Sequence, residues 1–174
     1  YDHGRNDGFI GPESSNAWSM AYYTGEEIPF YYSLAKTFPL CDRYFCSVLA
    51  QTYPNRRFLL SGTAFGLIAT DTSSITGIPP NGTIFDRLDA HDISWASYAT
   101  NASTLYVISD IVKKNPSRIR TIDQFHADAK SGSLPAVSYV DPNILTSTEE
   151  SPQDISLGEY FVSTVANSLL NSPA

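Results

Sequence analysis

Residues 51–63 read QTYPNRRFLLSGT and predict a short helix with a well-marked start and end. Pro54 is tolerated in the first turn of a helix, where its missing N–H has no intrahelical acceptor to serve. Gly62 can adopt the left-handed conformation that ends helices. We therefore expect a helix at about residues 54–61, with Thr52 at or beside its N-terminus.

Thr52 has two interpretations at such a position. Free backbone N–H groups and the positive end of the helix dipole favour an anion at a helix N-terminus. Thr52 can therefore be a nucleophile that faces a phosphate. It can equally be a plain N-cap, and because Thr and Ser cap helices so often, local features alone favour the cap.

The composition is typical of a globular, acidic protein. The chain has 174 residues, of which 42% are hydrophobic and 17% charged, which excludes a disordered chain and suits one domain with a real core. The net charge of −7 argues against a nucleic acid or an anionic membrane as partner. No stretch is long enough to span a bilayer. Cys41 and Cys46 leave a disulfide open, and the sequence leaves the oligomeric state open.

The apolar spacing outward from this stretch predicts alternating helices and strands. Residues 105–112 are compatible with a strand or a helix. The other expected elements are a helix at about 25–37 opened by Thr24 and Glu27, a loop over 64–82, a helix through 84–90, a strand from Ile93, a helix from Thr121 or Asp123 to Gly132, a strand over 134–140, and a final helix capped by Ser156 and Glu159. This order indicates α/β layering with a mixed or mainly parallel sheet.

Two further places carry side chains of functional types. Asp141 ends an expected strand, where α/β proteins place functional groups, although turn formation before Pro142 explains it as well. Asp2, His3 and Asp7 are metal-ligating types in a glycine-punctuated segment. Nothing ties these three together, so we interpret the segment as turn-rich.

Ten stretches match one known family in its expected order. They are RNDGF (5–9), MAYY (20–23), IPFYYSLA (28–35), FPLCDRYF (38–45), TYPNR (52–56) with SGT (61–63), IFDRL (84–88), LPAVSYVDP (134–142), GEYFV (158–162) and SPA (172–174). Together they resemble the bacterial phosphoesterase family that contains non-haemolytic phospholipases C and certain acid phosphatases. The resemblance covers almost the whole chain.

This resemblance implies a partial alkaline-phosphatase-like α/β sandwich that lacks its first and last core strands, as a single incomplete phosphoesterase domain over residues 1–174. It implies metal-dependent hydrolysis of phosphoric esters. In such families the hydroxyl of the Thr-x-Pro-Asn-Arg motif is the nucleophile, which falls on Thr52 and gives a phospho-threonine intermediate. Thr52 would also contact a divalent metal ion. Asn55 and Arg56 would bind substrate or anchor the helix, and both interpretations stay open.

The chain also departs from the family pattern. The family's metal site draws on an early Glu-Asn pair and on a late segment with acidic and histidine residues, and neither occurs here. We therefore expect an internal piece of a longer protein, inactive on its own.

For the whole protein we expect a secreted or periplasmic phospholipase C that cleaves phosphatidylcholine-like phospholipids. One alternative is an acid phosphatase that accepts many small phosphate esters. The alternative from another class is a non-catalytic binding domain.

Overall fold

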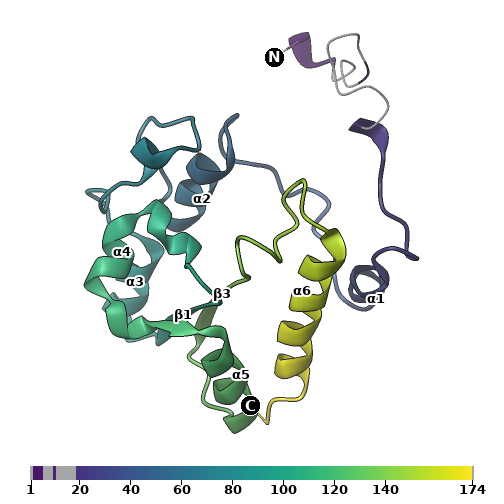
Figure 1. The fold of residues 1–174 in the computed structure, drawn as a ribbon. Helices are drawn as coiled ribbons and strands as arrows, with labels where there is room; N and C mark the ends of the chain where they lie inside the picture. The colour runs from purple at the N-terminus through teal and green to yellow at the C-terminus, as the bar shows by residue number, and fades with distance from the viewer. Residues whose placement is uncertain (1, 6–9, 11–18, 174) are drawn as a thin grey trace. The chain divides into compact units, whose positions relative to one another are not determined.

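The computed structural model describes residues 2–5, 10 and 19–173, and the chain divides into two compact units, residues 1–40 and 41–174 (Figure 1). The prediction of one domain over residues 1–174 is not tested by this division and stays a prediction. No helix in the described ranges combines the length and the apolar character that a membrane crossing requires.

The first unit contains the helix α1 (Pro29–Thr37) and a short 3₁₀ turn, η1 (Asp2–Gly4). The predicted start at about residue 25 was wrong. Residues 25–27 form a turn instead, in which the Glu27 carboxylate accepts the Thr24 N–H at 2.7 Å. The helix begins at Pro29 because a residue before proline is disfavoured in the helical region. Asp7 lies outside the described residues, so its grouping with Asp2 and His3 stays untested.

The second unit is built on a three-stranded parallel sheet in the order β2-β1-β3. The strands are β1 (Trp95–Ala99), β2 (Ile119–Thr121) and β3 (Val137–Asp141). Ala99 pairs with Thr121 on one side and with Asp141 on the other. The carboxyl ends of all three strands therefore meet at one edge of the sheet. This arrangement confirms the predicted α/β class with a partial, open sheet.

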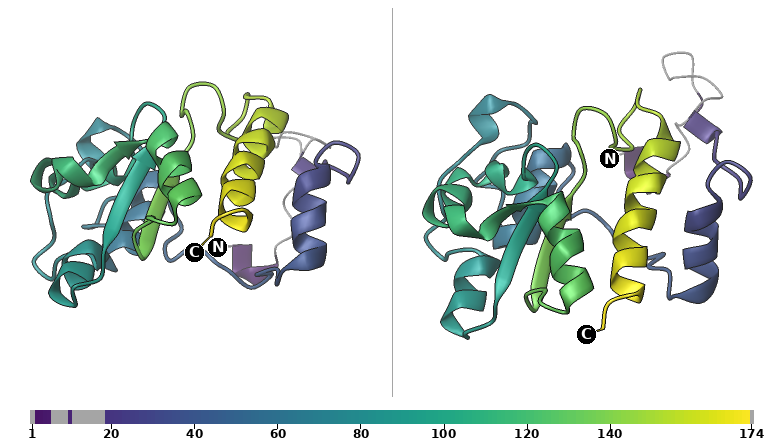
Figure 2. Two further views of the ribbon diagram at one scale, coloured as in Figure 1. Left: turned by 90° about the horizontal axis from the view of Figure 1, so that it is seen from below. Right: turned by 60° about the horizontal axis from the view of Figure 1, so that its bottom comes forward.

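Helices cover both faces of this sheet (Figures 1 and 2). Leu60, Phe85 and Ile111 bring α2 (Thr52–Ser61), α3 (Ile84–Ala90) and α4 (Ser109–Lys114) onto the face of Trp95. Phe125 and Val165 bring α5 (Ile122–Ser131) and α6 (Ile155–Leu170) onto the opposite face, that of Ala96 and Tyr98. Alternate residues of β1 thus enter two separate cores, which is why all five of its residues are buried.

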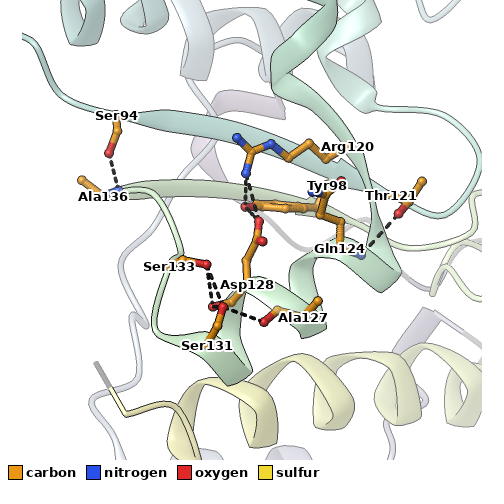
Figure 3. A network of polar contacts seen from close by, with 10 residues as sticks. All are labelled: Ser94, Tyr98, Arg120, Thr121, Gln124, Ala127, Asp128, Ser131, Ser133 and Ala136. Atoms are coloured by element: carbon orange, nitrogen blue, oxygen red, sulfur yellow. Dashed lines mark hydrogen bonds and ion pairs between the residues drawn. The ribbon is translucent and has the colours of Figure 1, made fainter.

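A polar network ties β1 and β2 to α5 on that second face (Figure 3). The Tyr98 hydroxyl donates to Asp128 Oδ2 at 2.8 Å, and Arg120 Nη1 lies 2.9 Å from the same oxygen. Arg120 Nη1 also donates to the Tyr98 hydroxyl at 3.2 Å. Burial, followed by the bond to Asp128, raises the pKa of Tyr98 to about 12. All three polar side chains are thereby engaged with one another inside the fold.

The two glycine stops were predicted correctly. Gly62 ends α2 at φ 69° and Gly132 ends α5 at φ 68°, both in the left-handed region. Thr121 caps α5 by accepting the Gln124 N–H, as the sequence indicated.

Other boundaries differ from the prediction. Helix α2 begins at Thr52 instead of residue 54. Residues 105–112 divide between the 3₁₀ helix η4 (Thr104–Val107) and α4. Helix α6 is capped by Asp154, whose carboxylate accepts both the N–H and the hydroxyl of Ser156. The predicted cap at Ser156 was therefore wrong. The remaining 3₁₀ helices are η3 (Thr72–Ser74) and η5 (Pro116–Arg118).

Candidate functional site

The carboxyl edge of the sheet brings together residues from three parts of the sequence. Open α/β sheets bind ligands at this edge. The loop after β1 and the loop after β3 are joined here, because Asn101 Nδ2 donates to Asn143 Oδ1 at 3.1 Å and Asn101 Oδ1 accepts the Ile144 N–H at 3.2 Å. These bonds fix the loops that surround Asp141.

Asp141 is the buried carboxylate of this edge, with 3% of its surface exposed. Its Oδ2 accepts the Thr104 N–H at 2.9 Å, and its Oδ1 accepts the Thr104 hydroxyl at 2.7 Å. Burial raises the pKa of Asp141, whereas the bonds from Thr104 and the charge of Arg56 act in the opposite direction. The sequence left Asp141 open between a functional group and a turn former; the structure places it at the centre of a polar cluster.

Arg56 reaches this cluster from α2. Its Nη1 donates to the Thr104 hydroxyl at 3.4 Å, and that hydroxyl lies 3.2 Å from the hydroxyl of Tyr139. Arg56 is half-buried. Its guanidinium therefore lies at the rim of the sheet edge, with Asp141 on the far side of Thr104.

Thr52 is the first residue of α2, and it is not the N-cap. Gln51 holds that position, with no side-chain capping bond. The Tyr53 N–H donates instead to the Thr70 hydroxyl at 3.1 Å, and the Thr70 N–H donates to Gln51 Oε1 at 2.6 Å. The interpretation of Thr52 as a plain cap was therefore wrong. Thr52 is exposed, and its hydroxyl makes no hydrogen bond with any described residue.

Asn55 is occupied by the segment that leads into Thr52. Its Oδ1 accepts the Val48 N–H at 3.3 Å, and its Nδ2 donates to the carbonyls of Val48 at 3.2 Å, Ala50 at 2.9 Å and Gln51 at 3.1 Å. The amide thus holds the chain on the N-terminal side of α2. The contact of Asn55 with a substrate stays a prediction.

Arg57, which the sequence analysis did not single out, is a buried anchor of the same helix. It is 0% exposed, and its Nε donates to the Val107 carbonyl at 3.0 Å. Burial lowers its pKa. Its position four residues after the core-packed Tyr53 places both on one side of α2, and this spacing was the available signal. Arg56 and Arg57 thus diverge, one to the sheet edge and one to the core.

The described residues near Thr52 and Asp141 include few metal-ligating side chains. Among the described ranges, no group of three His, Cys, Asp or Glu side chains could hold a metal ion. Thr52 and Asp141 alone do not supply the three or four protein ligands of a zinc site. The described residues therefore do not fit a metal centre, and no chemical step below is assigned to a metal.

Comparisons with known proteins show the family of the chain. The model of the phosphoesterase family matches residues 1–174. The chain is 30% identical over 167 residues to non-specific phospholipase C1 of Arabidopsis thaliana, covering 88% of this chain and 30% of that protein. It is 30% identical over 183 residues to phospholipase C A of Mycobacterium tuberculosis (strain ATCC 25618 / H37Rv), covering 90% of this chain and 35% of that protein. It is 27% identical over 197 residues to non-hemolytic phospholipase C of Pseudomonas aeruginosa, covering 99% of this chain and 28% of that protein.

These relatives come from plants as well as bacteria, so the resemblance is wider than the bacterial group that the motifs suggested. The chain spans about a third of the length of the curated relatives it matches. The chain belongs to the phosphoesterase family.

Proposed function

We propose that Thr52 is the nucleophile of a phospholipase C that cleaves phosphatidylcholine-like lipids. The observation that carries this proposal is the position of Thr52 as the first residue of α2, exposed and free of any capping bond. A threonine that caps its own helix has its oxygen engaged with the backbone. The Thr52 oxygen has no such engagement, because Thr70 takes the capping role.

The proposed reaction has two steps. Thr52 Oγ attacks the phosphorus, a new Oγ–P bond forms, and the bond from phosphorus to the diacylglycerol oxygen breaks. The Thr52 proton passes to solvent, and the diacylglycerol oxygen takes a proton from solvent. Water then attacks the phosphorus, the Oγ–P bond breaks, Thr52 regains a proton, and the phosphorylated head group leaves.

Arg56 supports this chemistry through charge. It follows Thr52 by four residues, so both lie on the same side of α2, one turn apart. An arginine offers several N–H donors in a planar fork that matches phosphate oxygens. Charge develops on those oxygens when Thr52 attacks, and a positioned cation stabilises it. We assign Arg56 to the phosphoryl oxygens and Asn55 to the placement of the chain around Thr52.

The substrate class, the metal ion and the cellular location are supported by likeness to other proteins. The choice of a phospholipid is supported by the names of the relatives. A divalent metal ion, with Thr52 as one ligand, and a secreted or periplasmic location rest on the motif resemblance alone. A metal would need ligands other than the described residues.

Substitution of Thr52 in the complete protein tests the proposal. Thr52→Ala should lower turnover of phosphatidylcholine vesicles by at least about a thousandfold, because it removes the attacking oxygen. Thr52→Ser, the matched control, keeps a hydroxyl and should retain much of the turnover. If Thr52→Ala loses no more activity than Thr52→Ser, Thr52 is not the nucleophile. If the protein is a non-catalytic binding domain, the unsubstituted protein and both variants should all lack turnover.

A further inference from the structure

Among the residues that the structure describes, Thr104 is the one that is hydrogen-bonded to both Arg56 and Asp141. Its hydroxyl donates to Asp141 Oδ1 at 2.7 Å and lies 3.4 Å from Arg56 Nη1 and 3.2 Å from the Tyr139 hydroxyl. A hydroxyl has one proton to donate and two lone pairs that accept. The proton goes to the carboxylate, so the Arg56 and Tyr139 groups donate to the lone pairs. The Thr104 hydroxyl is then fully used.

Asp141 fixes the orientation of Thr104 by binding it twice. One carboxylate oxygen accepts the Thr104 backbone N–H at 2.9 Å, and the other accepts its hydroxyl. Asp141 is itself buried, so water does not compete freely for either bond. The Thr104 side chain therefore has a single orientation, and the lone pair that receives Arg56 has a fixed direction.

Arg56 is held by a neutral group and keeps its charge available. Within the described part of the chain, no carboxylate lies within ion-pair distance of Arg56. The Thr104 hydroxyl stands between the guanidinium and Asp141, and it uses only one Nη1 donor. The remaining donors are left for an anion near Thr52.

We propose that Asp141, acting through the Thr104 hydroxyl, is a positioning residue that aims Arg56 at the phosphoryl group attacked by Thr52. This inference rests on the proposed function. Misplacing a catalytic group by about 1 Å lowers the reaction rate by up to about a hundredfold. Holding Arg56 in one position should therefore have a measurable effect on the rate. Asp141 itself contacts neither the substrate nor the reacting atoms.

A purely structural role for the same contacts is the competing account. The bond from the Thr104 N–H to Asp141 satisfies a free donor at the start of η4, and that alone would anchor the loop. The two accounts differ over the hydroxyl. A structural role predicts that loss of the Thr104 hydroxyl lowers stability and nothing else.

The test compares Thr104→Val with Thr104→Ser and Tyr98→Phe in the complete protein. Thr104→Val keeps the shape and the backbone bond but removes the hydroxyl. Tyr98→Phe, the matched control, also removes a hydroxyl that donates to an aspartate, on the other face of the sheet. The measurements are kcat and KM on phosphatidylcholine vesicles and inhibition by orthovanadate, an oxyanion that imitates the five-coordinate phosphoryl group.

Thr104→Val should lower kcat about tenfold to a hundredfold and weaken vanadate inhibition by a similar factor, with a smaller change in KM. Thr104→Ser should restore both values, and Tyr98→Phe should change neither. Asp141→Asn should resemble Thr104→Val, because one of its two oxygens becomes an NH₂ group that cannot accept a hydrogen bond.

The inference is overturned if Thr104→Val and Tyr98→Phe lower stability alike and leave kcat and vanadate inhibition unchanged. That result, together with an inactive Thr52→Ala, would remove the positioning role and leave the proposed function standing. An active Thr52→Ala would overturn both.

Discussion

Two sets of an aspartate, a hydroxyl and an arginine lie on this sheet, and they use the same groups differently. In the first, Arg120 Nη1 binds Asp128 directly at 2.9 Å, and the Tyr98 hydroxyl donates to the same carboxylate oxygen (Figure 3). In the second, the Thr104 hydroxyl separates Arg56 from Asp141. The first set neutralises its arginine by direct pairing, whereas the second holds its arginine and leaves the charge available.

The difference follows from where each set lies along the strands. Arg120 and Tyr98 are cross-strand partners, and Asp128 reaches them from α5, which packs on that face. Asp141 ends β3, at the edge where loops replace packed helices. A buried polar network is most stable when every member is satisfied. A site that binds an anion instead needs a cation that its surroundings leave partly unpaired.

Arg56→Lys gives the largest expected contrast with the first set. It should lower turnover of phosphatidylcholine vesicles by about a hundredfold to a thousandfold, since a lysine cannot reproduce the planar fork. The matched variant Arg120→Lys should leave turnover within about twofold. Equal losses in both variants would mean that Arg56 acts on the fold and not on the substrate.

Arg120→Met should have the next largest effect, on stability. It leaves Asp128, which is largely buried, without its cation, and loss of a charged hydrogen bond costs about 1–3 kcal/mol in the free energy of unfolding. Arg56→Met, measured by the same urea titration, should cost less than about 1 kcal/mol, because it removes one long bond to a neutral hydroxyl. The reverse order of stabilities would contradict the distinction between the two sets.

Tyr98→Phe should have the smallest effect at neutral pH, about 1 kcal/mol for a lost hydrogen bond, and a distinct one in alkali. The folded-state pKa of Tyr98 is raised from 10.0 to about 12, so the folded state resists ionisation. The stability that this shift gives is present below pH 10 and is lost as the pH rises through about 12. The variant should lack this loss, so the stability difference between the two proteins narrows over that range. A pH-independent difference would contradict the assignment.

Local signals in the sequence were enough for much of the fold. Gly62 and Gly132 marked helix ends because the left-handed conformation that ends a helix favours glycine. Thr121 marked a helix start because a threonine side chain can accept a backbone N–H of the first turn, here that of Gln124. The parts that failed needed a choice between neighbours. Asp154 caps α6 in place of Ser156. Strand β2 was not predicted, and it is only three residues long.

The candidate site was predictable only in part, because its partners are distant in sequence. The motif drew attention to Thr52 and Arg56, which are four residues apart. Thr104 and Asp141 are 37 residues apart, and nothing local in the sequence joins them. The adjacent pair Arg56 and Arg57 shows the same limit, since one goes to the core and the other to the sheet edge only through packing against η4.

Isolation of the covalent intermediate tests the central claim most directly. The complete protein would be mixed with phosphatidylcholine vesicles, quenched in acid during turnover, digested and analysed by mass spectrometry. The account predicts a phosphorylated head group attached to the peptide that contains Thr52, absent from Thr52→Ala. Attachment of the head group to another residue would contradict the account. So would rapid turnover with no attached group, provided that the same acid quench preserves the intermediate of a control phospho-enzyme.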